Sequence, residues 1–537
     1  MNRGEVLRVP YDSIPEGSST RSDIIFYREG ENVTAASNRC RHQGGTMVFE
    51  EDCFVCPRHN WQLNPKTMQY ISPDGLDHPT FEVAHEGLDL VVISESVNHP
   101  WTLDFREPAN LKVGELIIRF LAHACAEFLC GRTKLITDPW LVGPAFTRGW
   151  WLAHDPPSDW LESLAGATAI YISHNHSDHL NFHTLNRLAE VNPLIPIFIP
   201  NFGSSSCEQL IRRAGMKNVT HVPFGQWVNL DEEMRFMLLR DTAGREDSGI
   251  LIDYRGHLIL NTVDCSNLNN GDLPSKVDVL LAPFAGGASG YPVCWPELYS
   301  DEEIEKVVAR NRAAVLARLR ETLRTVNPSY FVPFAGYFVE AHSGDEDIRL
   351  RNGKNSPERA IDLAESFEGT KGWLPHPGAT LDVATGLSEG VEYTKRSSWD
   401  NEFSMYIPPI DDSLNFIPLK DLRGVQRYFE WTGFHGDLVL HVIEMDEYLK
   451  QTLREFYVDF RGVSISSKKP AGQFRYLRMK VRATSFRHVL KNGEPWEEIS
   501  IGFQGRFFRE PDRYNFDFWD HMQNSLPVGT PWEHPYL

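Results

Sequence analysis

The sequence predicts a multidomain protein in three parts: an all-β domain over residues 1–100, a central αββα domain over 111–380, and an α+β region over 381–537 that packs on the central domain. Three observations support this division. Two Cys–His pairs interrupt short strand-like segments near the N-terminus, a dense group of histidine and aspartate follows a strand in the middle, and a Pro-His-Pro-Gly break at 375–378 precedes an aromatic-rich tail. A chain of 537 residues is also too long for one ordinary core.

Composition limits the classes of function. The hydrophobic fraction of 41% and the charged fraction of 23% are typical of soluble globular proteins. We find no apolar stretch long enough for a transmembrane helix and no apolar signal core in the first 30 residues, so we expect a cytoplasmic protein without membrane insertion. A net charge of −20 disfavours nucleic acid as a partner, and an anionic ligand would therefore need a local group of Arg or Lys. Eight cysteines without a secretion signal do not indicate a disulfide framework.

The N-terminal domain carries two Cys–His pairs, Cys40-x-His42 and Cys56-x-x-His59. Each loop supplies one thiolate and one imidazole, which is the ligand pattern of a Rieske [2Fe–2S] cluster. A Cys₂His₂ zinc site is the alternative, but it would usually pair the two cysteines on one loop and the two histidines on the other. We therefore predict an all-β Rieske domain, closed near residue 95 by the strand at 88–93.

The central domain holds His174, His176, Asp178 and His179 directly after the strand-like run at 169–172. By strand alternation His174 and His176 point the same way, and the following turn can bring Asp178 and His179 to a second metal position. This His-x-His-x-Asp-His motif is that of the metallo-β-lactamase superfamily, which binds one or two metals. Zinc would indicate a hydrolase and iron a redox enzyme. The Rieske pattern favours iron, because a one-electron donor serves iron that activates O₂.

The remaining candidate ligands come from separate segments of the chain. Asp264 stands at the end of a strand, where we expect an aspartate that bridges two metals; a helix N-cap is the alternative. The loop that normally supplies a third histidine has none, so Glu246 or Asp247 would substitute, and the sequence does not choose between them. His342 is the candidate for the last ligand, with a surface histidine as the alternative. His123 is expected to support the site rather than to bind metal.

Further stretches share a likeness that the fold alone would not produce: residues 40–45, 143–152, 154–161, 261–265, 284–290, 333–340 and 501–506. They resemble the cytidine monophosphate-N-acetylneuraminic acid hydroxylase family, and the likeness runs from about residue 20 to the C-terminus. The resemblance implies hydroxylation of the N-acetyl methyl group of CMP-N-acetylneuraminate to the N-glycolyl form. It implies O₂ and electrons from NAD(P)H, delivered by a donor such as cytochrome b5 or a ferredoxin with its reductase. Ala-Gly-Arg at 243–245 replaces a histidine-bearing stretch of the animal enzymes, which leaves the neighbouring ligand open and allows a different substrate.

These expectations combine into one hypothesis for a non-haem di-iron site. One iron would be bound by His174, His176 and the carboxylate at 246 or 247. The other would be bound by Asp178, His179 and His342, with Asp264 as the bridge.

The substrate is anionic, so the acidic chain needs local cations. Arg148 is the first candidate, with Trp150 or Trp151 stacking on cytosine. Packing of these three side chains at a domain junction is the alternative.

Two other functions stay open at this point. One is the same Rieske-coupled chemistry on a different amide or amino-sugar substrate, and the other is a zinc hydrolase with a redox-sensing Rieske domain. The aromatic side chains of residues 390–537 are expected to pack a core, with capping of the metal cleft as the alternative.

Overall fold

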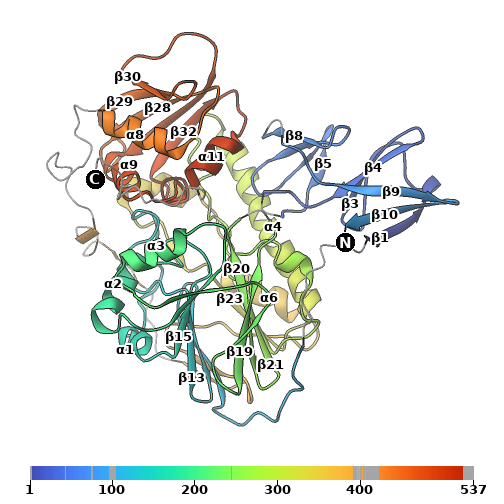
Figure 1. Cartoon of the computed structure of the whole chain (residues 1–537), viewed down its shortest axis with the longest axis vertical. Coiled ribbons are helices and arrows are strands. Elements are labelled where there is room, and N and C mark those ends of the chain that lie inside the picture. The colour runs from blue at the N-terminus through green and yellow to red at the C-terminus, as the bar shows by residue number, and fades with distance from the viewer. Residues whose placement is uncertain are drawn as a thin grey trace.

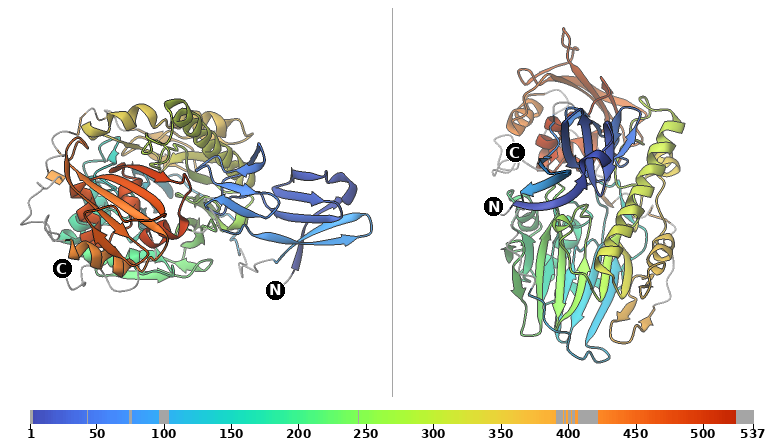
Figure 2. Two further views of the ribbon diagram at one scale, coloured as in Figure 1. Left: turned by 90° about the horizontal axis from the view of Figure 1, so that it is seen from above. Right: turned by 90° about the vertical axis from the view of Figure 1, so that its right-hand side faces the viewer.

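The computed structural model describes residues 3–42, 44–73, 76–95, 104–243, 245–390, 396, 398–399, 402, 405–406 and 422–523. It contains three parts (Figure 1), in the order that the sequence predicts. The N-terminal domain and the C-terminal region both lie at one end of the central strands, as Figures 1 and 2 show from different sides. None of the helices in the described ranges combines the length and the apolar composition that a membrane span requires.

The N-terminal domain is built from two antiparallel sheets. The six-stranded sheet contains β1 (Arg3–Pro10), β2 (Gly17–Arg21), β3 (Ile24–Glu29), β4 (Asn32–Ser37), β9 (Thr80–Glu86) and β10 (Asp89–Glu95), with the short helix η1 (Tyr11–Ser13) after β1. The four-stranded sheet contains β5 (Val48–Glu50), β6 (Cys53–Val55), β7 (Gln62–Asn64) and β8 (Gln69–Ser72). The two Cys–His loops belong to the smaller sheet, because one precedes β5 and the other joins β6 to β7.

The central domain packs two sheets face to face between two layers of helices. The eight-stranded sheet comprises β11 (Leu116–Ala122), β12 (Cys125–Cys130), β13 (Thr133–Thr137), β15 (Ala169–Tyr171), β16 (Ile197–Pro200), β17 (Val219–Val222), β26 (Thr380–Asp382) and β27 (Ser388–Glu389). The seven-stranded sheet comprises β18 (Trp227–Asn229), β19 (Met234–Arg240), β20 (Ser248–Tyr254), β21 (His257–Asn261), β22 (Val279–Pro283), β23 (Tyr330–Phe334) and β25 (Lys371–Gly372). Their inner faces form one apolar core. Since β26 pairs with β11, this sheet continues to Glu389, past the expected boundary at 380.

The helices follow the αββα pattern. On one side lie α1 (Trp160–Ala165), α2 (Phe182–Val191) and α3 (Ser206–Arg213), and on the other α4 (Asp301–Val326), α5 (Glu346–Arg351) and α6 (Pro357–Glu365) (Figure 1). The long helix α4 begins with a capping box, in which Ser300 and Glu303 satisfy each other's backbone N–H groups. A two-stranded ribbon of β14 (Trp151–Leu152) and β24 (Phe338–Val339), with η2 (Asn269–Gly271) and η3 (Ser343–Asp345), completes the domain.

The C-terminal region is a five-stranded sheet with helices on one side. Its strands are β28 (Leu438–Met445), β29 (Thr452–Asp459), β30 (Ser464–Ser466), β31 (Arg475–Arg482) and β32 (Gly505–Glu510), and its helices are α8 (Arg423–Thr432), α9 (Ala483–Asn492), α10 (Glu497–Ser500) and α11 (Phe516–Gln523). The aromatic residues of the tail, such as Phe429, Phe460 and Phe518, fill a core that is continuous with the α1–α3 side of the central domain. The region therefore shares its core with the central domain.

Candidate metal centres and the cavity between them

The four Rieske residues converge at the tip of the smaller N-terminal sheet. Tight turns hold both loops, since Gly44 N donates to Cys40 O at 2.8 Å and Asn60 N donates to Cys56 O at 2.9 Å. The ring centroids of His42 and His59 lie 4.6 Å apart. The Nδ1 atoms of both rings are buried, with no hydrogen-bond partner in the described structure. Two free buried thiols and two unpartnered imidazole nitrogens fit the ligand set of a [2Fe–2S] cluster.

The surroundings of these loops favour a neutral His42 and a deprotonated Cys56, whereas burial and the contact with Cys56 raise the pKa of Cys40. Burial lowers the pKa of His42 to about 3, with the positive charges of Arg245 and Arg58 adding to the effect, so the ring is neutral. The contact with Cys40 lowers the pKa of Cys56 to about 7. Trp61 stacks on His42 at 4.5 Å, and the Tyr70 hydroxyl lies 3.7 Å from Cys40 Sγ.

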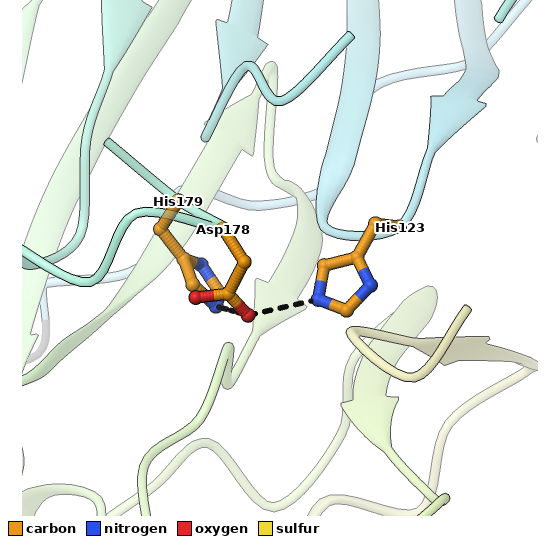
Figure 3. Close-up of side chains that lie close together, drawn as sticks. All are labelled: His123, Asp178 and His179. Atoms are coloured by element: carbon orange, nitrogen blue, oxygen red, sulfur yellow. Dashed lines mark hydrogen bonds and ion pairs between the residues drawn. The ribbon is translucent and has the colours of Figure 1, made fainter. Parts of the chain in front are cut away.

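The central domain brings three buried side chains, His123, Asp178 and His179, to one point (Figure 3). The Asp178 Oδ2 atom lies 3.1 Å from His123 Nε2 and 3.4 Å from His179 Nε2. His123 occupies the turn between β11 and β12 with a φ of 40°, a region that disfavours side-chain-bearing residues. The Asp138 carboxylate, from the loop after β13, lies 3.0 Å from His179 Nδ1 and accepts from Ser173 N at 2.7 Å. Such a carboxylate fixes the ring of a metal-binding histidine.

A second group, His174, His176 and Asp264, lies beside the first. Asp264 follows β21 in a turn, because the strand ends at Asn261 and Cys265 N donates to Thr262 O at 3.0 Å. Its Oδ2 lies 3.6 Å from His179 Nε2, so this carboxylate contacts both groups. The Nε2 atoms of His174 and His179 are buried and lack a hydrogen-bond partner among the described residues, as expected of atoms that would face metal ions.

The two acidic candidates at 246 and 247 differ in position. Glu246 points to α3, where its carboxylate accepts hydrogen bonds from the backbone and hydroxyl groups of Ser204. Asp247 is 1% exposed, its Oδ1 lies 3.4 Å from His174 Nδ1, and its Oδ2 has no hydrogen-bond partner in the described structure. Asp247, and not Glu246, therefore lies beside a metal-binding histidine, on the Nδ1 side of the His174 ring.

His342 lies away from both groups. Its Nδ1 accepts a hydrogen bond from Gly344 N at 2.9 Å, as the N-cap of η3, and lies 3.4 Å from Arg482. Burial and the Arg482 charge lower the pKa of His342 to about 3. The structure therefore brings His123 to Asp178 and His179, in the position that we expected for His342. The β11–β12 turn, which carries His123, projects into the site, and the segment after β24, which carries His342, does not.

Two of the three candidates for substrate binding, Arg148 and Trp151, pack the junction with the C-terminal region. This packing role was the alternative to substrate binding. Arg148 is 8% exposed, and its Nη2 donates to Thr484 Oγ1 at 2.6 Å. Trp151 is fully buried and donates to Arg148 O at 3.0 Å. Trp150 differs, because it stacks on Phe338 at 3.5 Å and lines the cavity described below.

The sequence analysis missed two residues of the site. Glu497, from α10 of the C-terminal region, places Oε2 2.9 Å from His176 Nε2. Arg245, from the loop after β19, places Nη2 3.2 Å from the same nitrogen. No local motif indicates Glu497. The adjacent Glu498 has the same side chain, and the contact between Glu497 and His176 depends on tertiary packing.

All three parts of the chain enclose a single cavity of about 680 Å³. Its wall includes His42 and His59 from the N-terminal domain, His176, Asp178 and Asp264 from the central domain, and Glu497 from the C-terminal region. Six arginines also line it: Arg39, Arg58, Arg245, Arg310, Arg318 and Arg509. Helix α4 anchors the N-terminal domain over this space, because Arg310 pairs with Glu50 and Asn311 Nδ2 donates to Arg58 O at 3.2 Å.

The fold and these two groups of ligands define a Rieske protein that also carries a metallo-β-lactamase-like metal-binding domain. Two family models agree: the Rieske [2Fe-2S] domain matches residues 7–75, and the beta-lactamase superfamily domain matches residues 117–317. Both fold predictions are thereby confirmed.

Relatives of known name extend over nearly the whole chain. Cytidine monophosphate-N-acetylneuraminic acid hydroxylase of Mus musculus is 38% identical over 96% of this chain and 93% of its own length. The protein of that name from Asterias rubens is 39% identical over 93% of this chain and 80% of its own length. The chain belongs to the cytidine monophosphate-N-acetylneuraminic acid hydroxylase family. Among solved structures, CmlA, a diiron beta-hydroxylase from Streptomyces venezuelae, matches 50% of this chain and 54% of its own at 15% identity, with a TM-score of 0.35.

Proposed function

We propose that this protein is a monooxygenase that hydroxylates the N-acetyl methyl group of CMP-N-acetylneuraminate to give CMP-N-glycolylneuraminate. The observation that carries the proposal is the shared cavity: the ligand set for a Rieske cluster and the ligand sets for two metals open onto one space, in a chain of this family. An electron donor and a metal centre that face one cavity serve a redox reaction, and a hydrolase has no use for the donor.

In this proposal, the cluster would be held by Cys40, His42, Cys56 and His59. One iron would be held by His174, His176 and Asp247, and the other by His123, Asp178 and His179, with Asp264 available to both sites. When bound, these groups supply single electrons and O₂ activation. Seven of the assigned residues each have a buried polar atom without a hydrogen-bond partner in the described structure, which supports this assignment: His42, His59, His123, His174, Asp178, His179 and Asp247.

The protein's part is to position the substrate and to exclude water. The substrate carries a phosphodiester and a carboxylate, and the cavity offers Arg58 and Arg318 for these anions. Burial and the neighbouring charges of Arg39 and Arg58 lower the pKa of Arg318 to about 10, so it remains protonated at neutral pH in a strongly positive environment. An anion would relieve that repulsion. The apolar wall formed by Trp61, Trp150 and Trp295 limits the water that can enter beside the reacting methyl group.

Electrons would come ultimately from NAD(P)H, through a donor such as cytochrome b5 or a ferredoxin with its reductase. Both kinds of donor work inside cells, so the proposal includes a cytoplasmic location.

Product analysis tests the proposal. The purified protein is reduced chemically and incubated with CMP-N-acetylneuraminate and ¹⁸O₂, and the nucleotide sugar is analysed by mass spectrometry. We expect one ¹⁸O atom in the acyl group and about four irons per chain. A chain with zinc in the central site that cleaves substrate without consuming O₂ would refute the proposal in favour of a hydrolase. O₂ consumption with another N-acyl sugar, and none with CMP-N-acetylneuraminate, would keep the chemistry and change the substrate.

A further inference from the structure

The Glu497 carboxylate reaches the metal-binding residues from a different part of the chain. Its Oε2 lies 2.9 Å from His176 Nε2, and the two side chains are 8% and 7% exposed. Helix α10 begins at Glu497, and the residue after its end, Ile501, accepts a hydrogen bond from Trp150 Nε1 at 3.0 Å. The position of the carboxylate is therefore fixed against the central domain.

This contact determines which nitrogen of His176 remains for a metal. A metal-binding imidazole usually gives its other N–H to a carboxylate or a carbonyl, which fixes the tautomer and the ring orientation. Glu497 at 2.9 Å and Arg245 at 3.2 Å both contact Nε2, with the carboxylate the nearer of the two, so Nδ1 is the atom left for the metal. His174 shows the reverse arrangement, because its Nδ1 lies 2.9 Å from Ser173 Oγ and its Nε2 is the unpartnered atom.

The same carboxylate also faces the N-terminal domain. Glu497, Arg245, His42 and His176 line one cavity, and Arg245 Nη2 lies 3.5 Å from Glu497 Oε1. The groups nearest to the carboxylate, the Arg245 guanidinium and the His176 ring, are partners for its negative charge.

We propose that Glu497 is a positioning residue of the metal centre: it holds His176 through Nε2 and places a negative charge beside this metal-binding histidine, in the cavity that the Rieske histidine His42 also lines. The C-terminal region would then complete the site rather than only cap it. This inference rests on the proposed function, because it assumes a cluster at one site and iron at the other.

The neighbouring Glu498 provides a matched control. It is equally buried, at 6% exposed, and lies on the same helix, but its carboxyl group accepts a hydrogen bond from Thr147 N at 2.9 Å. Glu498→Gln therefore makes the same substitution one residue further along the helix, at a carboxyl group that is bonded to Thr147.

The test uses two measurements that need no substrate. The first is the iron that each full-length protein retains in the central site against a chelator, with the Rieske absorption as the internal reference. We expect Glu497→Ala to weaken iron binding about 10- to 100-fold, and Glu498→Gln to match the unmodified protein. The second is the midpoint potential of the cluster, which we expect to rise in Glu497→Gln, because removing a nearby negative charge favours the reduced state, and to stay unchanged in Glu498→Gln.

Each result of these two measurements either supports or overturns a part of the proposal. Iron retention and potential that both match the Glu498→Gln protein would overturn the proposal. Weaker iron binding with an unchanged potential would support the orienting role and reject the electrostatic one. If Glu497→Ala fails to fold, Glu497→Gln, which has nearly the same shape, decides both questions. Neither measurement depends on CMP-N-acetylneuraminate, so a wrong substrate assignment would leave this test valid.

Discussion

Removing the Arg318 guanidinium should weaken the binding of CMP far more than the binding of cytidine. Arg318 lies on α4 and lines the cavity, and its guanidinium donates one hydrogen bond in the described structure, to Gly44 O. Its other N–H groups can therefore bind phosphate. A hydrogen bond to a charged group contributes about 1.5–3 kcal/mol, and about 1.4 kcal/mol corresponds to a tenfold change in affinity. Arg318→Gln should therefore raise the Kd for CMP by about 10- to 140-fold.

Isothermal titration with CMP and with cytidine measures this difference directly. The exposed Arg320 on the same helix provides the control, since Arg320→Gln removes the same charge away from the cavity. We expect CMP binding by Arg320→Gln to be nearly unchanged, and cytidine binding to be similar in all three proteins. If Arg318→Gln lowers the affinity for both ligands equally, Arg318 only docks the N-terminal domain through Gly44. If it lowers neither, the anion binds elsewhere.

Three further predictions follow from the other sites. Cys40→Ser should abolish the Rieske spin-resonance signal and turnover while iron remains in the central site; surviving turnover would show that the electron route is wrong. His123→Ala should lower the iron content of the central site and His342→Ala should not, because of these two histidines only His123 contacts Asp178. Metal analysis measures both variants, and a lower iron content in His342→Ala alone would restore His342 as a ligand. Asp345→Asn should cost about 3–5 kcal/mol, measured as a lower thermal midpoint, because it leaves the buried Arg482 without its carboxylate partner at 2.8 Å. Although burial opposes it, Arg482 lowers the pKa of Asp345, so this stabilisation is present above about pH 3.9 and is lost as the pH falls below it. A variant as stable as the unmodified protein at pH 7 would contradict that prediction.

The sequence predicted the parts of the site that depend on local order. Cys40 with His42, and His174 with His176, are each separated by one residue on a short loop or strand end, so covalent geometry alone keeps them together. The strand-like run at 169–172 likewise predicted β15, the strand that positions the histidine motif. The family resemblance was confirmed by relatives that cover almost the whole chain.

The other residues of the site depend on how distant segments pack. His123 is separated from Asp178 by 55 positions and Glu497 from His176 by 321. No sequence motif near His123 or Glu497 indicates these contacts. Glu246 and Asp247 are neighbours in sequence, yet successive residues entering β20 point to opposite sides, so only one can face His174. Arg148 between aromatic residues suits both an anion site and a buried junction, and only its partners Thr484 and Glu447 distinguish the two.

The central claim is that the cluster and the iron site face one cavity within one chain. Spin relaxation of the reduced cluster tests it most directly, by comparing fully reduced protein with its central site loaded and emptied of iron. The account predicts faster relaxation of the Rieske signal in the loaded protein, by an amount that does not change with protein concentration. Identical relaxation in the two samples, or an enhancement that disappears on dilution, would contradict it.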